Sequence, residues 1–156
     1  MPDYDISVEV TTEPPAEFDA GALPVLAGRV MAGEQVQHGT ALSILVCGDD
    51  EVREMNRMFL GIDEPTDVLS FPDEADDFVV GAADEPLLGD IAIALPTAQR
   101  QALEIGHSLD AEVAHLLVHG ILHLCGYDHV DDPVAERLMR EREEHYLGHL
   151  GAVHHH

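Results

Sequence analysis

The segment from Ser108 to Gly126 constrains the fold of this chain more than any other. Its large apolar residues recur every three or four positions, at Leu109, Val113, Leu116, Leu117, Ile121 and Leu124. This spacing predicts a helix, because an α-helix completes one turn in about 3.6 residues. Ser108 or Asp110 can begin the helix, and Gly126 is a typical residue just beyond its end. We expect this helix to lie at the centre of the fold.

Four other segments have the pattern of β-strands. Residues 4–11 alternate polar and apolar side chains, as a half-buried strand does, whereas residues 40–47 form an apolar run typical of a buried strand. Residues 67–71 and 89–94 are the third and fourth predicted strands. Helices are also expected in four further segments: 16–32, 51–60, 96–106 and 132–147. The last of these carries arginines among glutamates, which we interpret as a solvated, self-paired surface.

The chain has 156 residues, which is enough for one domain with its own core. We expect a single α+β domain over residues 1–150, in which a mixed sheet of about four strands packs against four or five helices. The final residues, 151–156, end in three histidines. We interpret them as a disordered tail or the remnant of an affinity tag.

The charge of the chain excludes one class of function. There are 31 acidic residues against 7 basic ones, which gives a formal net charge of −24. A globally cationic binder of nucleic acid or of anionic membranes is therefore excluded, because phosphate contacts need a basic surface. A locally positive or metal-assisted site stays compatible with this charge.

The chain also lacks the marks of secretion. Its N-terminal residues do not resemble a signal peptide, and no apolar run approaches the roughly 18 residues of a membrane span. Cys47 and Cys125 are too few for a disulfide framework and are expected to be reduced thiols. A cytoplasmic protein without a membrane partner is therefore expected.

Three histidines in and after the predicted central helix have the spacing of a metal site. His119 and His123 lie four residues apart, so their imidazoles are one helical turn apart and can meet at one ion. Gly126 then lets the chain turn, so that His129 can supply a third nitrogen. Three neutral imidazoles with a vacant fourth position are typical of catalytic zinc. We predict one zinc ion per chain, held by His119, His123 and His129, with a zinc-bound water as nucleophile and no assigned protein base.

Two further residues, His115 and Glu112, lie on the same side of the predicted helix as His119 and His123. His115 lies one turn before His119, but a fourth ligand there would block the open position of the metal. We therefore expect His115 to support the site or to pack in the core. Glu112 can orient an imidazole, or can simply be a first-turn carboxylate that the helix dipole favours.

The spacing H-x-x-x-H-x-x-G-x-x-H is shared with the metzincin peptidases. Those enzymes carry a glutamate directly after the first histidine as the general base, and this chain has Gly120 at that position. A metzincin-like peptidase is therefore a weaker alternative, because another carboxylate would have to replace the missing base.

Residues 119–129 resemble the signature of the YbeY family of bacterial metal-dependent endoribonucleases. Residues 65–72 and 89–91 match two further family segments in the same order. The preceding helix fits the family as well, at Asn56, Phe59 and Gly61. The resemblance implies a single zinc on the three histidines and a function in rRNA maturation, notably at the 3′ end of 16S rRNA, and in ribosome quality control. The implied partners are single-stranded rRNA and the ribosome or small-subunit proteins, with no DNA expected.

One position departs from the family pattern. Members usually carry an arginine where this chain has Leu60, and such an arginine would hold a phosphate and spread transition-state charge. Arg57, one turn earlier, either takes this role or is an ordinary surface residue. The resemblance also suggests Asp67 and Ser70 as a pocket wall beside the metal. The alternative is that Asp67 forms a turn and Ser70 fills a strand.

Two classes of function follow from these observations. The leading hypothesis is a zinc-dependent hydrolase that cuts single-stranded RNA, with either water or the 2′-hydroxyl of the RNA as the attacking group. The rival is a ribosome-assembly or interaction factor whose zinc mainly stabilises the fold, and both Leu60 and the negative charge favour it. Because the ion would be the local positive charge on a negative body, RNA affinity is expected to be weak and metal-dependent.

Overall fold

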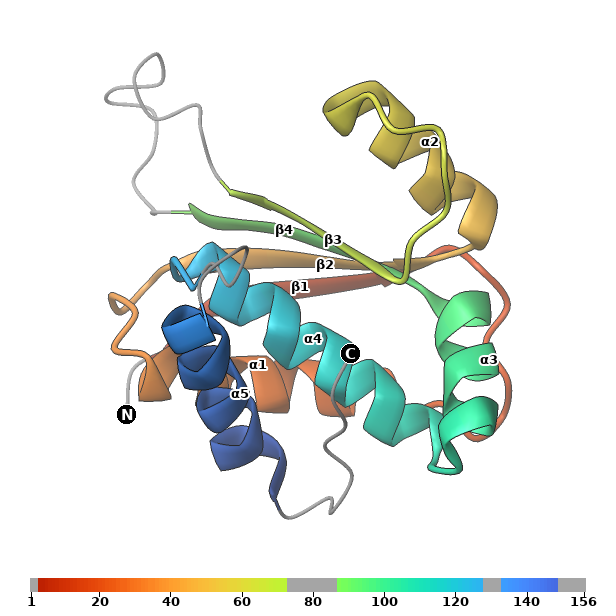
Figure 1. Cartoon of the computed structure of the whole chain (residues 1–156). Coiled ribbons are helices and arrows are strands. Elements are labelled where there is room, and N and C mark those ends of the chain that lie inside the picture. Colours follow the sequence, from red (N-terminus) through yellow and green to blue (C-terminus); the bar gives the residue numbers. More distant parts are fainter. Residues whose placement is uncertain (1–2, 73–86, 128–132, 149–156) are drawn as a thin grey trace.

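A four-stranded sheet with helices on both faces organises the chain, as the computed structural model of residues 3–72, 87–127 and 133–148 shows (Figure 1). The strands are β1 (Asp5–Val10), β2 (Ala41–Cys47), β3 (Val68–Pro72) and β4 (Leu87–Ala94). The helices of the described residues are α1 (Ala22–Gly33), α2 (Asp49–Leu60), α3 (Leu95–Ile105), α4 (Leu109–Leu124) and α5 (Pro133–Leu147). The predicted α+β class, with a four-stranded mixed sheet and five helices, is confirmed.

The strand order is β1-β2-β4-β3. Strands β1, β2 and β4 are parallel, whereas β3 runs antiparallel to β4 at the edge of the sheet. Helices α1 and α4 cover one face, α5 packs on α4, and α2 lies over the opposite face beside β3 and β4 (Figure 1). This arrangement places the edge strand β3 between α2 and α4.

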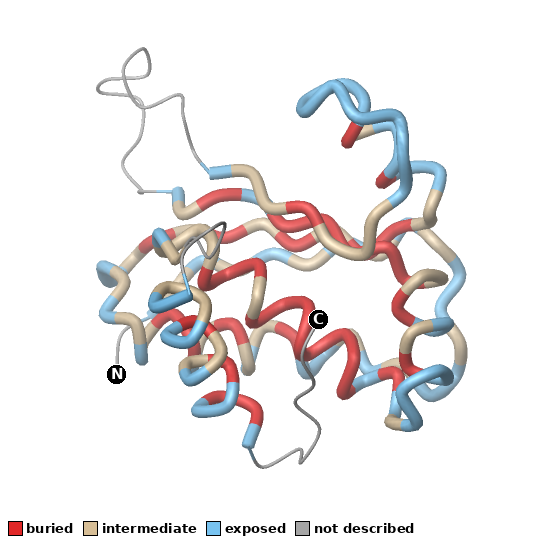
Figure 2. The backbone as a smooth tube through the Cα atoms, viewed as in Figure 1, coloured by how far each residue is buried: buried red, intermediate tan, exposed pale blue. Residues whose placement is uncertain are grey.

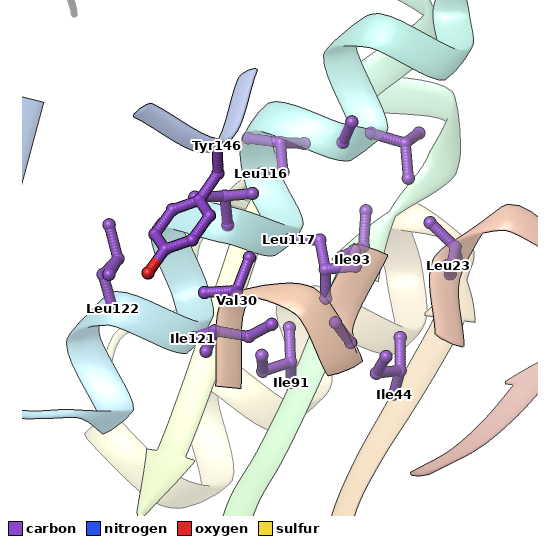
Figure 3. Packing of buried hydrophobic residues seen from close by; sticks show 14 of the residues in the cluster. Leu23, Val30, Ile44, Ile91, Ile93, Leu116, Leu117, Ile121, Leu122 and Tyr146 are labelled. Carbon is purple, nitrogen blue, oxygen red and sulfur yellow. The ribbon is translucent and has the colours of Figure 1, made fainter. Parts of the chain in front are cut away.

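Helix α4 is the central helix of the fold, as its apolar pattern predicts. Twelve of its 16 residues are buried, whereas α2 is mostly exposed (Figure 2). The core between the sheet and the helices includes Val30 of α1, Ile44 of β2, Ile91 and Ile93 of β4, and Leu117 and Ile121 of α4 (Figure 3). Burial on nearly every side of α4 means that polar side chains on it must find partners inside the protein.

The helix predicted from residue 16 begins at Ala22 instead. Pro24 lies in the first turn of α1, where its missing N–H needs no partner, so it marks the start of the helix instead of interrupting it. Residues 16–21 form turns, in which the Phe18 amide donates to the Pro15 carbonyl at 3.1 Å and the Gly21 amide donates to Asp19 Oδ1 at 3.0 Å.

The interpretation of the arginines in the last helix as a solvated surface is correct for Arg140 and wrong for Arg142. Arg140 pairs with Glu136 one turn away at 2.9 Å. Arg142 instead donates to Glu34 Oε2 at 2.6 Å and to the Tyr146 hydroxyl at 2.9 Å. It therefore ties α5 to the end of α1, because Glu34 follows directly after that helix.

The two cysteines are free thiols, as expected. Burial raises the pKa of Cys47 to about 12 and that of Cys125 to about 11, so both stay protonated at neutral pH. No helix in the described part of the chain combines the length and the apolar character that crossing a membrane requires.

Candidate metal centre

His119 and His123 project from successive turns of α4 and approach each other closely. Their Nε2 atoms are 3.1 Å apart, and their ring planes are inclined by 77°. Two nitrogens bound to one tetrahedral zinc, with bonds of about 2.0–2.1 Å, are about 3.3–3.4 Å apart. A small outward movement of the two rings would therefore accommodate one zinc ion.

The other ring nitrogen of His119 contacts a carboxylate from a different helix. His119 Nδ1 lies 2.6 Å from Oε2 of Glu143 on α5, and the Glu143 side chain is 8% exposed. Metal-binding histidines almost always donate their second N–H to a carboxylate, a carbonyl or a water. This contact therefore has the arrangement expected behind a metal ligand.

Glu143 is shared between two histidines of α4. His115 Nε2 lies 3.5 Å from Glu143 Oε1, and His115 is 1% exposed. Burial alone would raise the pKa of Glu143, but hydrogen bonds and charge from His115 and His119 outweigh burial and lower the pKa to about 2. The carboxylate is therefore ionised at neutral pH. His115 lies beside this carboxylate, one turn away from the converging pair of imidazoles.

The predicted third ligand, His129, lies outside the described residues. Within the ranges 3–72, 87–127 and 133–148, no group of three or more His, Cys, Asp or Glu side chains is placed to hold a metal ion. The structure therefore describes two of the three predicted ligands.

A groove of about 430 Å³ runs beside the two histidines. Its walls come from the side of α4 that carries His115, His119 and His123, from the start of β3 and from the end of α2. Asp67, Ser70, His119 and His123 all line it, so the structure brings these four predicted site residues together. Leu60 also lines the groove. The position at which the resemblance leads us to expect an arginine therefore lies in the groove wall.

Arg57 is not brought to the groove. It is about half exposed on α2, and its guanidinium forms an ion pair with Glu54 on the same helix. None of the described residues that line the groove is an arginine. As the structure stands, Arg57 therefore behaves as an ordinary helix-surface residue.

Asp67 combines both roles considered for it. Its side chain accepts a hydrogen bond from the Val68 amide at 2.8 Å and another from Gln101 Nε2 at 3.3 Å. It thus fixes the start of β3 and ties that strand to α3, while it also lines the groove.

The structure also bears on the missing glutamate of the metzincin pattern. A Cβ atom added at Gly120 would lie 3.2 Å from Ile91 Cδ1, which is tighter than ordinary contact. Ile91 is 1% exposed and belongs to the core. A side chain at position 120 therefore meets Ile91 of β4 at close range, and a glutamate there would require the Ile91 side chain to shift by a few tenths of an ångström.

Glu143 is the site residue that sequence reasoning missed. It lies 24 residues after His119, among other acidic residues of a helix, and no local pattern connects the two. One signal was available. Met139, Glu143, Tyr146 and Leu147 share the buried face of α5 at helical spacing. A carboxylate on an otherwise apolar face indicates a buried polar partner.

Comparison with known proteins identifies the family of the chain. The family model described as endoribonuclease YbeY matches residues 15–151. The endoribonuclease YbeY of Chloroflexus aurantiacus is 45% identical over 148 residues, which cover 93% of this chain and 96% of that protein. The one from Roseiflexus castenholzii is 43% identical over 154 residues, which cover 97% of each chain.

The solution structure of TM1509 from Thermotoga maritima has a similar fold, with a TM-score of 0.58. The match covers 93% of this chain and 87% of that one at 24% identity, and it supports the fold alone. The family model spans most of the chain, and the two curated relatives span more than nine-tenths of it at 45% and 43% identity. The chain therefore belongs to the endoribonuclease YbeY family, and it is a hydrolase of the nuclease class.

Proposed function

We propose that this chain is a zinc-dependent, single-strand-specific endoribonuclease of rRNA maturation. Its substrate is rRNA, notably the 3′ end of 16S rRNA, and it acts in the cytoplasm, with ribosomal partners and a role in ribosome quality control. The observation that carries the proposal is the convergence of His119 and His123, whose Nε2 atoms are 3.1 Å apart in the wall of an open groove. Such a pair can hold a metal where a substrate reaches it.

The donor set suits zinc. His119 and His123 supply two imidazole nitrogens, and His129 would complete a three-histidine set with an open fourth position. Glu143 supports His119 from behind at 2.6 Å. When bound, a zinc ion supplies Lewis acidity that polarises a phosphoryl oxygen and lowers the pKa of water.

Exposed apolar surface at the end of α2 supports the proposed preference for unpaired RNA. Leu60 at the end of α2 lines the groove and is 56% exposed, so it offers apolar surface to unstacked bases. Phe59, the residue before it, is 64% exposed and lies outside the groove lining. Unpaired bases can pack on such side chains, whereas the bases of a duplex are stacked on one another. The hydroxyl of Ser70, in the same groove as the histidines, can donate to a phosphate oxygen.

The nucleophile determines the ends of the cleaved RNA. Attack by water breaks the P–O3′ bond. The 3′ oxygen takes up a proton, and the products are a 3′-hydroxyl and a 5′-phosphate. Attack by the neighbouring 2′-hydroxyl, which loses its proton, breaks the P–O5′ bond. The 5′ oxygen takes up a proton, and the products are a 2′,3′-cyclic phosphate and a 5′-hydroxyl. Analysis of the product ends distinguishes these two routes.

The negative charge of the chain makes binding depend on the metal. With a net charge of −24 and no arginine among the described groove residues, the protein itself repels RNA. An ion with neutral imidazole ligands keeps its full charge and makes the groove locally positive.

The test is cleavage of single-stranded RNA by the metal-loaded protein and by a double variant, His119→Ala with His123→Ala. We expect cleavage by the unaltered chain and none by the double variant, with paired RNA and DNA left intact. A control with His38→Ala and His145→Ala also removes two histidines, both exposed and outside the groove, and should cleave normally. Equal cleavage by the unaltered chain and the groove variant would indicate a contaminating nuclease and reject the proposal.

One observation favours the rival, in which zinc mainly stabilises the fold and catalysis is slight. Leu60 occupies the groove wall where the family usually has an arginine that could contact phosphate. Removal of the metal distinguishes the catalytic function from the structural one. A large fall in Tm together with no measurable turnover in either form would support the rival function.

A further inference from the structure

We infer that Glu143 is a positioning residue of the metal centre, which fixes the ring orientation and the tautomer of His119. The inference rests on the proposed function in requiring a metal at His119, and it adds a residue on α5 that acts through that histidine. The first support is geometric. The distance of 2.6 Å between Glu143 Oε2 and His119 Nδ1 is that of a strong charge-assisted hydrogen bond.

The chemistry of the two groups sets the direction of this bond. An ionised carboxylate can only accept, so Nδ1 of His119 must carry the proton. In the neutral ring, Nε2 is then unprotonated and can accept the hydrogen bond from His123 Nε2, which lies 3.1 Å away. The carboxylate thus holds His119 in the tautomer that a metal ligand requires, before any metal is bound.

The environment of Glu143 argues for such a role. Glu143 is 6% exposed and lies on the buried face of α5, together with Met139, Tyr146 and Leu147. Burial of a carboxylate is costly unless charged or hydrogen-bonding groups surround it. Here both oxygens face histidines of α4, with His115 Nε2 at 3.5 Å from Oε1. Contacts on both oxygens restrain the carboxylate in its orientation toward His119.

Two arms test the inference, and the first uses variants. Glu143→Gln keeps the shape of the side chain and removes its charge, and it should weaken zinc affinity about 10- to 100-fold. The matched control is Glu144→Gln, which makes the same change at the next, exposed position and should leave the affinity unchanged. Zinc affinity is measured by competition with a chelator of known affinity. A variant that merely packed less well would have a lower Tm without this selective loss.

The second arm needs no variant. The ¹⁵N chemical shifts of the His119 ring in the metal-free chain, at a pH where the ring is neutral, should show the proton on Nδ1. A proton on Nε2 overturns the inference, and so does unchanged zinc affinity in Glu143→Gln. If the unaltered chain then still cleaves RNA with zinc, the proposed function stands and only the role of Glu143 falls. If the unaltered chain binds no zinc, both fall.

Discussion

The Tyr127 hydroxyl donates a hydrogen bond of 2.8 Å to Glu34 Oε1 and so joins the segment after α4 to the end of α1. Glu34 also accepts from Arg142 and Tyr146 of α5. One carboxylate, whose side chain is 7% exposed, therefore ties together three parts of the chain. Tyr127 is the last described residue before position 129, so the same carboxylate holds a residue two positions before the predicted third ligand.

Glu34→Gln is expected to destabilise the fold by about 1–3 kcal/mol, because it weakens the partner of a partly buried arginine and of two tyrosine hydroxyls. Urea unfolding measures the change in the free energy of unfolding. Glu104→Gln, at an exposed position of α3, is the matched control and should change it by less than about 0.5 kcal/mol. Equal effects of the two variants would contradict the structural role of Glu34.

The same carboxylate predicts a dependence of stability on pH. Burial raises the pKa of Glu34, but hydrogen bonds from Tyr146, Arg142 and Tyr127 outweigh burial and hold the pKa below its ordinary 4.5. A carboxyl whose pKa is lower in the folded state than in the unfolded state stabilises the fold when it is ionised. This stabilisation is fully present above the pKa of the unfolded state and is lost as the pH falls through the pKa of the folded state. The difference in unfolding free energy between the unaltered chain and Glu34→Gln should therefore shrink as the pH falls below about 4.5. A difference that grows on acidification would contradict this account.

Gly89→Ala is expected to destabilise the chain by about 2–4 kcal/mol. Gly89 has a φ of 153°, and an added Cβ would collide with the Phe71 carbonyl oxygen of β3 and with the Leu124 side chain of α4. Gly28→Ala is the control, because a Cβ there lies 3.8 Å from Ile6 in ordinary contact. Inside a helix that change should stabilise by up to about 1 kcal/mol. Thermal unfolding of the two variants should therefore shift Tm in opposite directions.

Leu60→Arg is expected to strengthen binding of single-stranded RNA about tenfold, through one added charge-assisted contact to phosphate. Leu60 is 56% exposed at the groove wall, so the change should not lower Tm. The plot of log affinity against log salt should become steeper by about 0.7. Leu60→Gln controls for the loss of the apolar side chain and should leave this slope unchanged. If Leu60→Arg has the same slope as the unaltered chain, position 60 does not contact phosphate.

Local patterns accounted for most of the fold. Strand alternation, apolar runs and helix ends such as Gly61, which has a φ of 74°, depend on neighbours in sequence and are visible there. The predicted helix over 16–32 begins six residues too early, because Pro24 belongs in the first turn of α1 and places the start of the helix at Ala22.

Local sequence patterns could predict only part of the candidate metal centre. His119 and His123 share a helix, so their spacing revealed their proximity. Glu143 and Glu34 meet their partners across the fold, and such contacts depend on how α5 and α1 dock on α4. Helix docking follows from packing of the whole core, and no short pattern encodes it.

The central claim is that RNA cleavage depends on zinc at His119 and His123. The most direct measurement follows cleavage of single-stranded RNA during chelation and stepwise reloading, with zinc content determined on the same samples. The account predicts that activity disappears with the metal and returns in proportion to bound zinc, up to one ion per chain. Full cleavage by protein that contains no metal would contradict it.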